Sequence, residues 1–518
     1  MQEKMKERRK SRAFNAPYES TRQLVLSGFE TPFERELDKG NRWVVLSQLI
    51  PWDEICGIYL RKVPSSSTGR PAINPRIVLG SLIIKYLCHL DDRETVDQIS
   101  ENVYMQYFLG YSSFTSDKPF DASLFVDFRK ELGLATINEI NEKIVSLKTQ
   151  MVSKEDTKQS KEEDSSGSTR ETKEEESENH KGKIILDATC CPQDIAYPTD
   201  LDLLSDAREK AEELIDIAYR KSGQVDKPRT YRKKARKLYL ATAQKKNKSK
   251  KVIRRAVREQ LQFLRRDIDI IHRLLDGCPR IPFKKRQLKY FYVIQTLYEQ
   301  QFEMYSKGVH SVEDRIVSIH QPHVRPIVRG KARSKVEFGS KIHVSVIDGI
   351  SFVDELNWDA FNEGSRMETY VEMYRNRFGF YPREVLADRI YCTRVNRNML
   401  KGKGIRLKAK PLGRPSALSI HVSPGERNPI EGKFGQAKTA YGLDRIRARL
   451  KQTSESWIAG IFMVLNLVKL AGAVLPCLIE KLVVEYIQKT LRRINFYAFR
   501  WDMNMDRYSL TPLWVGGV

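Results

Sequence analysis

The sequence predicts an α/β fold in which a mixed sheet carries a large basic helical insertion and follows a helical N-terminal domain. After residue 183, short apolar runs rich in β-branched residues alternate with helical patterns, as in sheets covered by helices. The pair Asp348-Gly349 separates two alternating runs, which predicts a β-hairpin. Residues 227–258 contain 15 lysines and arginines and no acid. The chain has 518 residues, which corresponds to about three domains at roughly 150 residues each.

The composition narrows the class of protein. The formal net charge is +24 and the pI is about 9.6, which favours a polyanionic partner, most simply nucleic acid. The alternative is a basic protein that needs charge only for solubility. Seven cysteines without a CxxC pair disfavour a zinc finger and fit a reducing compartment. The first residues are charged and lack the apolar core of a signal peptide, so we expect a cytoplasmic, nucleoid-associated protein.

The first 150 residues divide into a basic arm and a helical domain. Residues 1–40 are polar and basic with few apolar periods. Residues 41–150 predict helices that start after Asn74, after Asp91 or Asp92, and near Asp121, because these residues are good helix caps. Basic and aromatic positions in this domain fit a DNA-reading helix-turn-helix variant and fit simple packing equally well.

An acidic linker follows at residues 151–182. Residues 154–178 hold ten acids and five bases, and residues 153–183 contain no hydrophobic side chain. Such a segment cannot form a core, so it predicts disorder and marks a domain boundary. The second unit then covers residues 183–475, and residues 476–518 are predicted to form a C-terminal tail helix. Residues 457–475 are apolar but contain Asn466 and Lys469, which favours a buried core helix over a membrane span.

The second unit is predicted element by element. Residues 183–188 form a buried strand, and long helices fill an insertion at about residues 203–310. The hairpin at Asp348-Gly349 precedes a helix over residues 367–379. A second buried strand covers residues 383–388, a helix starts near Thr393, a short strand covers residues 405–410, and a long helix starts near Pro429.

Three acids stand where chemistry explains them more easily than structure does. Asp187 and Asp388 end buried strands, and Glu431 lies in the first turn of the helix that starts near Pro429. Strand ends hold carboxylates rigidly, and hard cations such as magnesium take carboxylate ligands together with substrate phosphates. Two such ions can activate a water or a 3′-hydroxyl and stabilise the leaving oxygen of a phosphodiester.

Each acid also has a structural explanation. Asp187 can close a turn, and Asp388 can be a loop acid. Glu431 and Asn428 match a capping box around a proline at the first helical position. Asp348 also ends an apolar strand, but the hairpin turn explains it, so it is not a candidate.

Several cations are predicted to contact DNA phosphates. Arg427 precedes Glu431, and Lys438 lies two helical turns after it on the same face. The basic tract and a second cluster contribute further candidates, which are Lys233, Lys234, Arg236, Lys237, Arg325 and Arg329. The alternative for each is an exposed, solvated side chain. No GxxxxGK[ST] motif occurs, which disfavours a nucleotide-driven motor.

Four sequence blocks resemble bacterial insertion-sequence transposases of the DDE type. The blocks are DATCCPQDIAYPTDLDLL, HQPHVRPIVRGKARSKVEFGSK, LADRIYCTRVNR and ERNPIEGKFGQAKTAYGL. The similarity covers about residues 184–470, and residues 70–133 resemble the N-terminal domain of the same group. The resemblance implies an RNase H-like catalytic domain at residues 183–475 that contains the insertion.

The resemblance also implies roles for single residues. Asp187, Asp388 and Glu431 match the three catalytic, metal-binding acids of the family, and Arg427, Glu431 and Lys438 fit its Arg–Glu–Lys signature. Pro424 stands where some members carry a tyrosine, so a role of that tyrosine is absent here or supplied elsewhere. Ile390 stands where the group often has glycine.

The implied function is metal-dependent DNA cleavage at insertion-sequence ends followed by strand transfer into target DNA. The expected cofactor is magnesium, as two ions, with manganese as the alternative. The expected partners are double-stranded DNA with terminal inverted repeats, target DNA and further copies of the chain on DNA, with no membrane. Two other functions stay open, an RNase H-like nuclease without strand transfer and a non-catalytic DNA-binding derivative.

Overall fold

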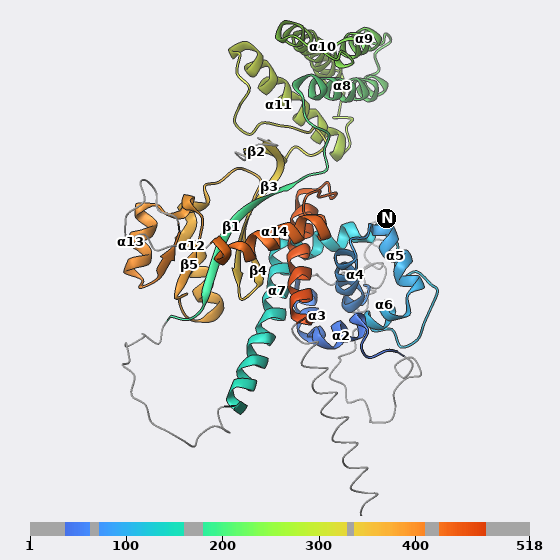
Figure 1. Cartoon of the computed structure of the whole chain (residues 1–518). Helices are drawn as coiled ribbons and strands as arrows, with labels where there is room; N and C mark the ends of the chain where they lie inside the picture. Colours follow the sequence, from blue (N-terminus) through green and yellow to red (C-terminus); the bar gives the residue numbers. More distant parts are fainter. Residues whose placement is uncertain (1–36, 63–71, 160–179, 329–335, 410–423, 473–518) are drawn as a thin grey trace, which may run out of the picture.

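The computed structural model describes residues 37–62, 72–159, 180–328, 336–409 and 424–472. These residues form a mixed α/β structure with one curled sheet and many helices (Figure 1). Four predictions fall wholly or mostly outside the described residues: the basic arm, most of the acidic linker, the C-terminal tail helix and Arg329.

The sheet has six strands and both parallel and antiparallel pairs. The strands are β1 (Lys183–Pro192), β2 (Arg325–Val328), β3 (Val336–Ile347), β4 (Ile350–Asn357), β5 (Glu384–Leu386) and β6 (Arg406–Lys408). β1 is antiparallel to β3 and parallel to β5, and β6 is parallel to β5. β2 and β4 both pair with β3. β1 lies inside the sheet, which explains its continuous apolar run.

The predicted hairpin is confirmed. Ile347 pairs with Ile350 across the turn, and the turn residues Asp348 and Gly349 have φ of 49° and 79°. Both values lie in the left-handed region that a two-residue hairpin turn requires, where Asp and Gly are tolerated. Asp348 is therefore explained by the turn, as the sequence predicts.

Helices precede the sheet in the chain. They are α2 (Arg42–Leu49), α3 (Trp52–Lys62), α4 (Pro75–Leu87), α5 (Asp92–Glu101), α6 (Val103–Phe108) and α7 (Leu124–Gln159). The predicted caps are confirmed at Asn74, which accepts from the backbone of Arg76, and at Asp91. α7 continues to Gln159, so it extends into the first residues of the predicted linker, whose bounds stay a prediction.

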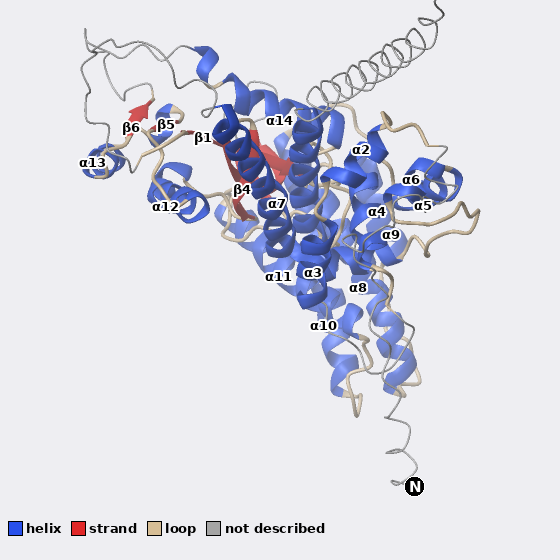
Figure 2. Ribbon diagram, turned by 90° about the horizontal axis from the view of Figure 1, so that it is seen from below, coloured by secondary structure: helices blue, strands red, loops and turns tan. Residues whose placement is uncertain are grey.

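These first helices share one hydrophobic core with the sheet. The core runs from Trp43 through the buried faces of β1, β3 and β4 to Leu470, and α7 packs against β4 (Figure 2). Such a shared core means that the helices and the sheet stabilise one another. The division of the chain into the predicted domains stays a prediction.

A buried charge cluster fixes α4 and α5 to α7. Lys85 and Arg129 are 1% and 3% exposed, both pair with Asp92, and both cations lie over the ring of Trp457. Buried charges require such partners. These two cations therefore serve packing, which is the second of the two explanations that the sequence left open for this region.

The helix Lys451–Gly472 is long and apolar enough to cross a membrane by length and composition. In the structure 67% of its most apolar window is buried, and Ile458, Phe462 and Leu465 are almost fully covered. Asn466 is also buried and bonds the backbone of Ser351 through both ends of its amide. The helix is part of the protein core, as its polar residues predict.

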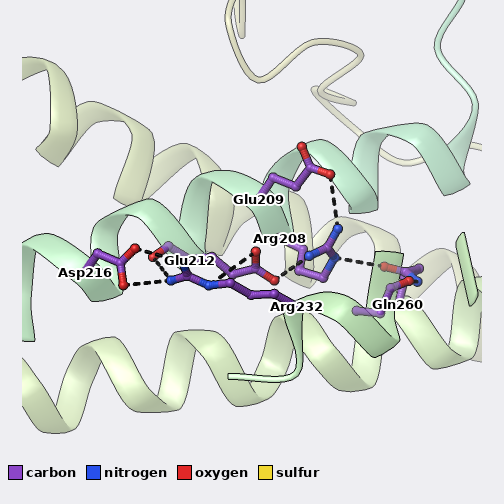
Figure 3. Close-up of polar contacts among 7 residues, drawn as sticks. Arg208, Glu209, Glu212, Asp216, Arg232 and Gln260 are labelled. Carbon is purple, nitrogen blue, oxygen red and sulfur yellow. Dashed lines mark hydrogen bonds and ion pairs between the residues drawn. The ribbon is translucent and has the colours of Figure 1, made fainter. Parts of the chain in front are cut away.

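The insertion between β1 and β2 is a helical bundle with its own core. It consists of α8 (Asp200–Ser222), α9 (Arg232–Ala243), α10 (Lys250–Asp276) and α11 (Lys285–Lys307), and its apolar cluster is separate from that of the sheet. Figure 3 shows how ion pairs hold α9 to α8. Arg232 contacts both oxygens of Asp216 at 2.8 Å, and buried Arg208 pairs with Glu212.

Beyond the hairpin, helices alternate with short strands. They are α12 (Met367–Phe378), α13 (Arg394–Gly402) and α14 (Asn428–Tyr441), with the 3-10 turns η3 (Glu363–Arg366), η4 (Arg389–Tyr391) and η5 (Pro424–Glu426). Thr393 caps α13 through a bond to the backbone of Asn396, which confirms the predicted start. The order of elements along the second unit thus follows the sequence-based prediction, except that the short strand β2 was not predicted.

The bundle contains a buried acid that should make its stability depend on pH. Asp267 on α10 is 4% exposed. Burial, together with the charge of Glu212, raises its pKa to about 7, whereas Arg208, Arg232 and Arg266 oppose the shift. The folded chain therefore holds the proton more tightly than the unfolded chain, whose Asp titrates near pH ~3.9.

We expect Asp267→Asn to unfold at a higher temperature than the unmodified chain at pH 8, and to do so by a smaller margin at pH 5. The wild-type contribution is present at low pH and is lost as pH rises toward 7, with a slope of at most about 1.4 kcal/mol per pH unit. Thermal unfolding at both pH values measures this. Asp269→Asn is the control because Asp269 is exposed on the same helix. Equal behaviour of the two variants at pH 8 would contradict the assignment.

Candidate active site

Asp187 lies on β1 beside the point where β5 ends. β5 pairs with β1 only at residues 183–185. At Asp187, therefore, no strand covers the side of β1 that faces β5. The side chain is 21% exposed, and its Oδ1 accepts a hydrogen bond from the backbone of Ala188 at 2.8 Å. Burial raises the pKa of Asp187 above its ordinary value, although that bond and the Arg427 guanidinium oppose the shift.

Asp388 reaches the same region from the end of β5. It is the second residue after the strand, and its Oδ1 accepts from the backbone of Arg389 at 2.7 Å, which caps η4. The neighbouring residue Ala387 is held by a backbone bond to Lys408. The side chain of Asp388 is 55% exposed. The predicted position after a buried strand is therefore observed, and the carboxylate is accessible.

Arg427 joins the two aspartates. One guanidinium nitrogen lies 3.4 Å from Oδ2 of Asp187 and the other lies 3.2 Å from Oδ1 of Asp388. The two acids are thus brought together, although Asp187 is separated from Asp388 by the whole insertion and the hairpin. Arg427 is the residue immediately before α14, so the start of this helix is tied to the ends of β1 and β5.

Glu431 lies on α14, four residues after Arg427. The predicted capping box is wrong, because Arg427 occupies the cap position without a side-chain cap bond and Asn428 is already helical. Ile430 and Phe434 are buried and fix the helix to the core, whereas Glu431 is exposed. No hydrogen bond or ion pair joins Glu431 to either aspartate in the described residues.

A further carboxylate, Glu363, was missed by the sequence reasoning. The negative charge of Glu363 raises the pKa of Asp187 more than the negative charge of Asp388 does. Oε1 of Glu363 lies 2.6 Å from Nζ of Lys341. Tyr391 is fully buried beside Glu363 and Asp187. Glu363 lies in a 3-10 turn that follows a loop, so no strand end or motif in the sequence indicates it.

The two turns that carry Glu363 and precede α13 are locked together. The amide of Asn396 donates to the carbonyl of Gly364 at 2.6 Å and to that of Tyr391 at 2.9 Å. A Cβ at Gly364 would lie 2.5 Å from the carbonyl oxygen of Ile390, so only glycine allows this close approach. The backbone that follows Asp388 is therefore held in place by packing and by buried hydrogen bonds.

The side chains do not form a metal site as they stand. Among the described residues, no group of three or more His, Cys, Asp or Glu side chains is arranged to hold a metal ion. Oδ2 of Asp187 and Oδ1 of Asp388 contact the guanidinium of Arg427 instead. The single positive charge of this guanidinium offsets one of the two carboxylate charges, and no chemical step through a metal ion follows from this arrangement.

The predicted DNA-contacting cations lie in different surroundings. Lys233, Lys234, Arg236 and Lys237 are exposed on α9, and none of the four forms an ion pair within the described chain. Arg325 begins β2, is 19% exposed, and has its Nε 3.4 Å from Asp359. Lys438 on α14 is half-buried. The exposed surface of α9 is thus the described region where the predicted cations are best placed to meet an external anion.

Comparisons with known proteins assign two parts of the chain. Residues 31–131 match the family described as a transposase domain (DUF772), and residues 385–468 match the transposase DDE domain. The second match contains Asp388, Arg427 and Glu431, whereas Asp187 lies outside both matches.

One related protein is the uncharacterized protein ORF8 in the nfe locus of Rhizobium meliloti. It is 31% identical over 160 residues, which are 30% of this chain and 64% of that protein. No solved structure matches the chain. On this one polypeptide, the match to a transposase domain is followed by the match to the transposase DDE domain.

Proposed function

We propose that the chain cleaves DNA at the ends of an insertion sequence and joins the freed 3′-hydroxyl to target DNA. The observation that carries the proposal is the meeting of Asp187 and Asp388 at Arg427, one turn before Glu431. The resemblance predicts these same residues from three distant sequence blocks. Three distant blocks that meet beside the end of β5 are expected of an active site. Unrelated acids in loops would not be expected to meet in this way.

The strand arrangement supports an RNase H-like catalytic domain. The order β4-β3-β1-β5-β6, with an antiparallel hairpin on one side of β1 and parallel strands on the other, puts the first strand in the middle. Asp187 on this strand is then next to the end of β5, where Asp388 follows. We propose this domain for residues 183–475, with the bundle α8–α11 as an insertion, and a separate role in DNA binding for residues 41–150.

The proposed roles follow from charge and position. Asp187, Asp388 and Glu431 are the catalytic carboxylates, and Arg427 and Lys438 contact phosphates of the bound DNA. Magnesium, or manganese in its place, is the proposed cofactor because carboxylates are the ligands that such hard cations take and because the resemblance to DDE transposases implies magnesium. We further propose that several copies act together on DNA with terminal inverted repeats, in the cytoplasm and close to the nucleoid.

We expect Asp187→Ala to bind a DNA fragment with the element ends but not to cleave it in the presence of magnesium. The substitution removes one proposed catalytic carboxylate from a side chain with few other contacts. Gel analysis of cut and joined products measures both steps, and joined products separate a transposase from a simple nuclease.

The matched control is Asp348→Asn, because Asp348 also follows an apolar strand but serves a hairpin turn that Asn tolerates. This control should cleave and join DNA like the unmodified chain. Full cleavage by Asp187→Ala would remove Asp187 from the reaction and contradict the proposed function.

The exposed cations of α9 predict salt-dependent DNA binding. Replacing Lys233, Lys234, Arg236 and Lys237 by alanine should flatten the plot of log affinity against log salt, by about 0.9 for each duplex phosphate that the protein no longer neutralises. Fluorescence anisotropy with a labelled duplex over a range of salt concentrations measures this slope.

The control removes the same number of charges from exposed cations that already pair with acids. These are Lys307, Arg375, Arg406 and Arg445, which pair with Glu303, Glu372, Glu384 and Asp194. An equal change of slope in both quadruple variants would show that only net charge matters. It would contradict the proposed DNA contact of α9 and leave these cations as solvated surface residues.

A further inference from the structure

Arg427 occupies the position between the two carboxylates that the proposed function assigns to catalysis. Its nitrogens contact Oδ2 of Asp187 and Oδ1 of Asp388. A divalent cation at this site would need oxygens of the same two groups. The guanidinium thus stands where a cation bound by these two groups would lie.

The contacts of Arg427 with the two aspartates are long and incomplete, so the guanidinium can be exchanged for another cation. Its distances of 3.2 and 3.4 Å exceed the roughly 2.7–2.9 Å of a strong charge-assisted bond. Its Nε is buried and has no hydrogen-bond partner in the described chain. One donor of the guanidinium is thus left unsatisfied, which makes its present position less favourable, because a buried donor without a partner loses its hydrogen bonds to water.

The local charge explains why a cation of some kind is needed here. Asp187 and Asp388 contact the same guanidinium, and Glu363 adds a third negative charge nearby. Glu363 has its own partner in Lys341, so Arg427 is the counter-ion of the two aspartates. Moving Arg427 away without a replacement would leave two close carboxylates unneutralised, one of them largely buried.

We propose that Arg427 is an exchangeable counter-ion that couples DNA binding to cation binding. Without DNA, the guanidinium holds Asp187 and Asp388 together. When DNA binds, a backbone phosphate takes the guanidinium, since its planar donors suit phosphate as well as carboxylate, and the freed carboxylates accept a divalent cation. The coupling is reciprocal, so the cation also strengthens DNA binding. This inference rests on the proposed function, because it assumes that these carboxylates bind the cation.

The test measures calcium affinity of the full chain by isothermal titration calorimetry, with and without a short DNA duplex. Calcium is a suitable probe because it takes oxygen ligands. Without DNA, Arg427→Ala should bind calcium about tenfold more tightly than the unmodified chain, within the usual range of coupling between sites. Adding the duplex should tighten calcium binding in the unmodified chain and should do so much less in Arg427→Ala.

Arg427→Lys separates this mechanism from general charge repulsion. Lysine keeps the positive charge but lacks the planar fork that bridges two carboxylates. We expect it to bind calcium more tightly than the unmodified chain in the absence of DNA. Arg445→Ala is the control, because Arg445 pairs with Asp194 on the surface, and its calcium affinity should not change. Thermal unfolding of each variant checks that it is folded.

Two results would overturn the inference. In the first, Arg427→Ala binds calcium no more tightly than the unmodified chain while Asp187→Asn loses calcium binding, which leaves the proposed function intact. In the second, Arg427→Lys has the same calcium affinity as the unmodified chain, which would show that the positive charge at residue 427 repels calcium and that bridging of the two carboxylates is not needed. Cleavage by Asp187→Ala, in contrast, would contradict the proposed function itself, whatever the calcium affinities are.

Discussion

The mutual repulsion of two carboxylates held at the end of β5 is the constraint on which the site depends. Asp187 is largely buried and its pKa is raised by burial, so its charged form is costly unless a cation lies close. Arg427 supplies that charge and at the same time joins the start of α14 to β1 and β5. The position of Glu431 follows from this contact, because Glu431 lies one helical turn further along α14.

The surrounding structure makes this arrangement rigid. The sheet and the N-terminal helices share one core, and the turns on either side of the site are locked by Asn396. The basic bundle, in contrast, has its own core and its own buried ion pairs. A rigid centre with a separately packed basic bundle suits a protein that must hold DNA by its backbone while two carboxylates stay in fixed positions.

The sequence predicts the local features more fully than the long-range ones, although it does group Asp187 with Asp388. Residues whose signals lie within a few positions behave as predicted, among them the caps Asn74 and Thr393 and the Asp348-Gly349 turn. Asn428 does not cap α14, because the contacts of Arg427 with two distant aspartates hold residue 427 at the cap position. Glu363 could not be found, because only the packing of η3 on η4 brings it near Asp187. The same holds for Lys85 and Arg129, whose partner Asp92 comes from another helix.

The most direct test of the central claim is the position of manganese in a crystal of the full chain with DNA, located by its anomalous scattering. We predict a peak between Asp187 and Asp388 with Glu431 turned toward it, and the guanidinium of Arg427 on a DNA phosphate. A complex with bound DNA in which Arg427 still bridges both aspartates and manganese lies elsewhere would contradict this claim.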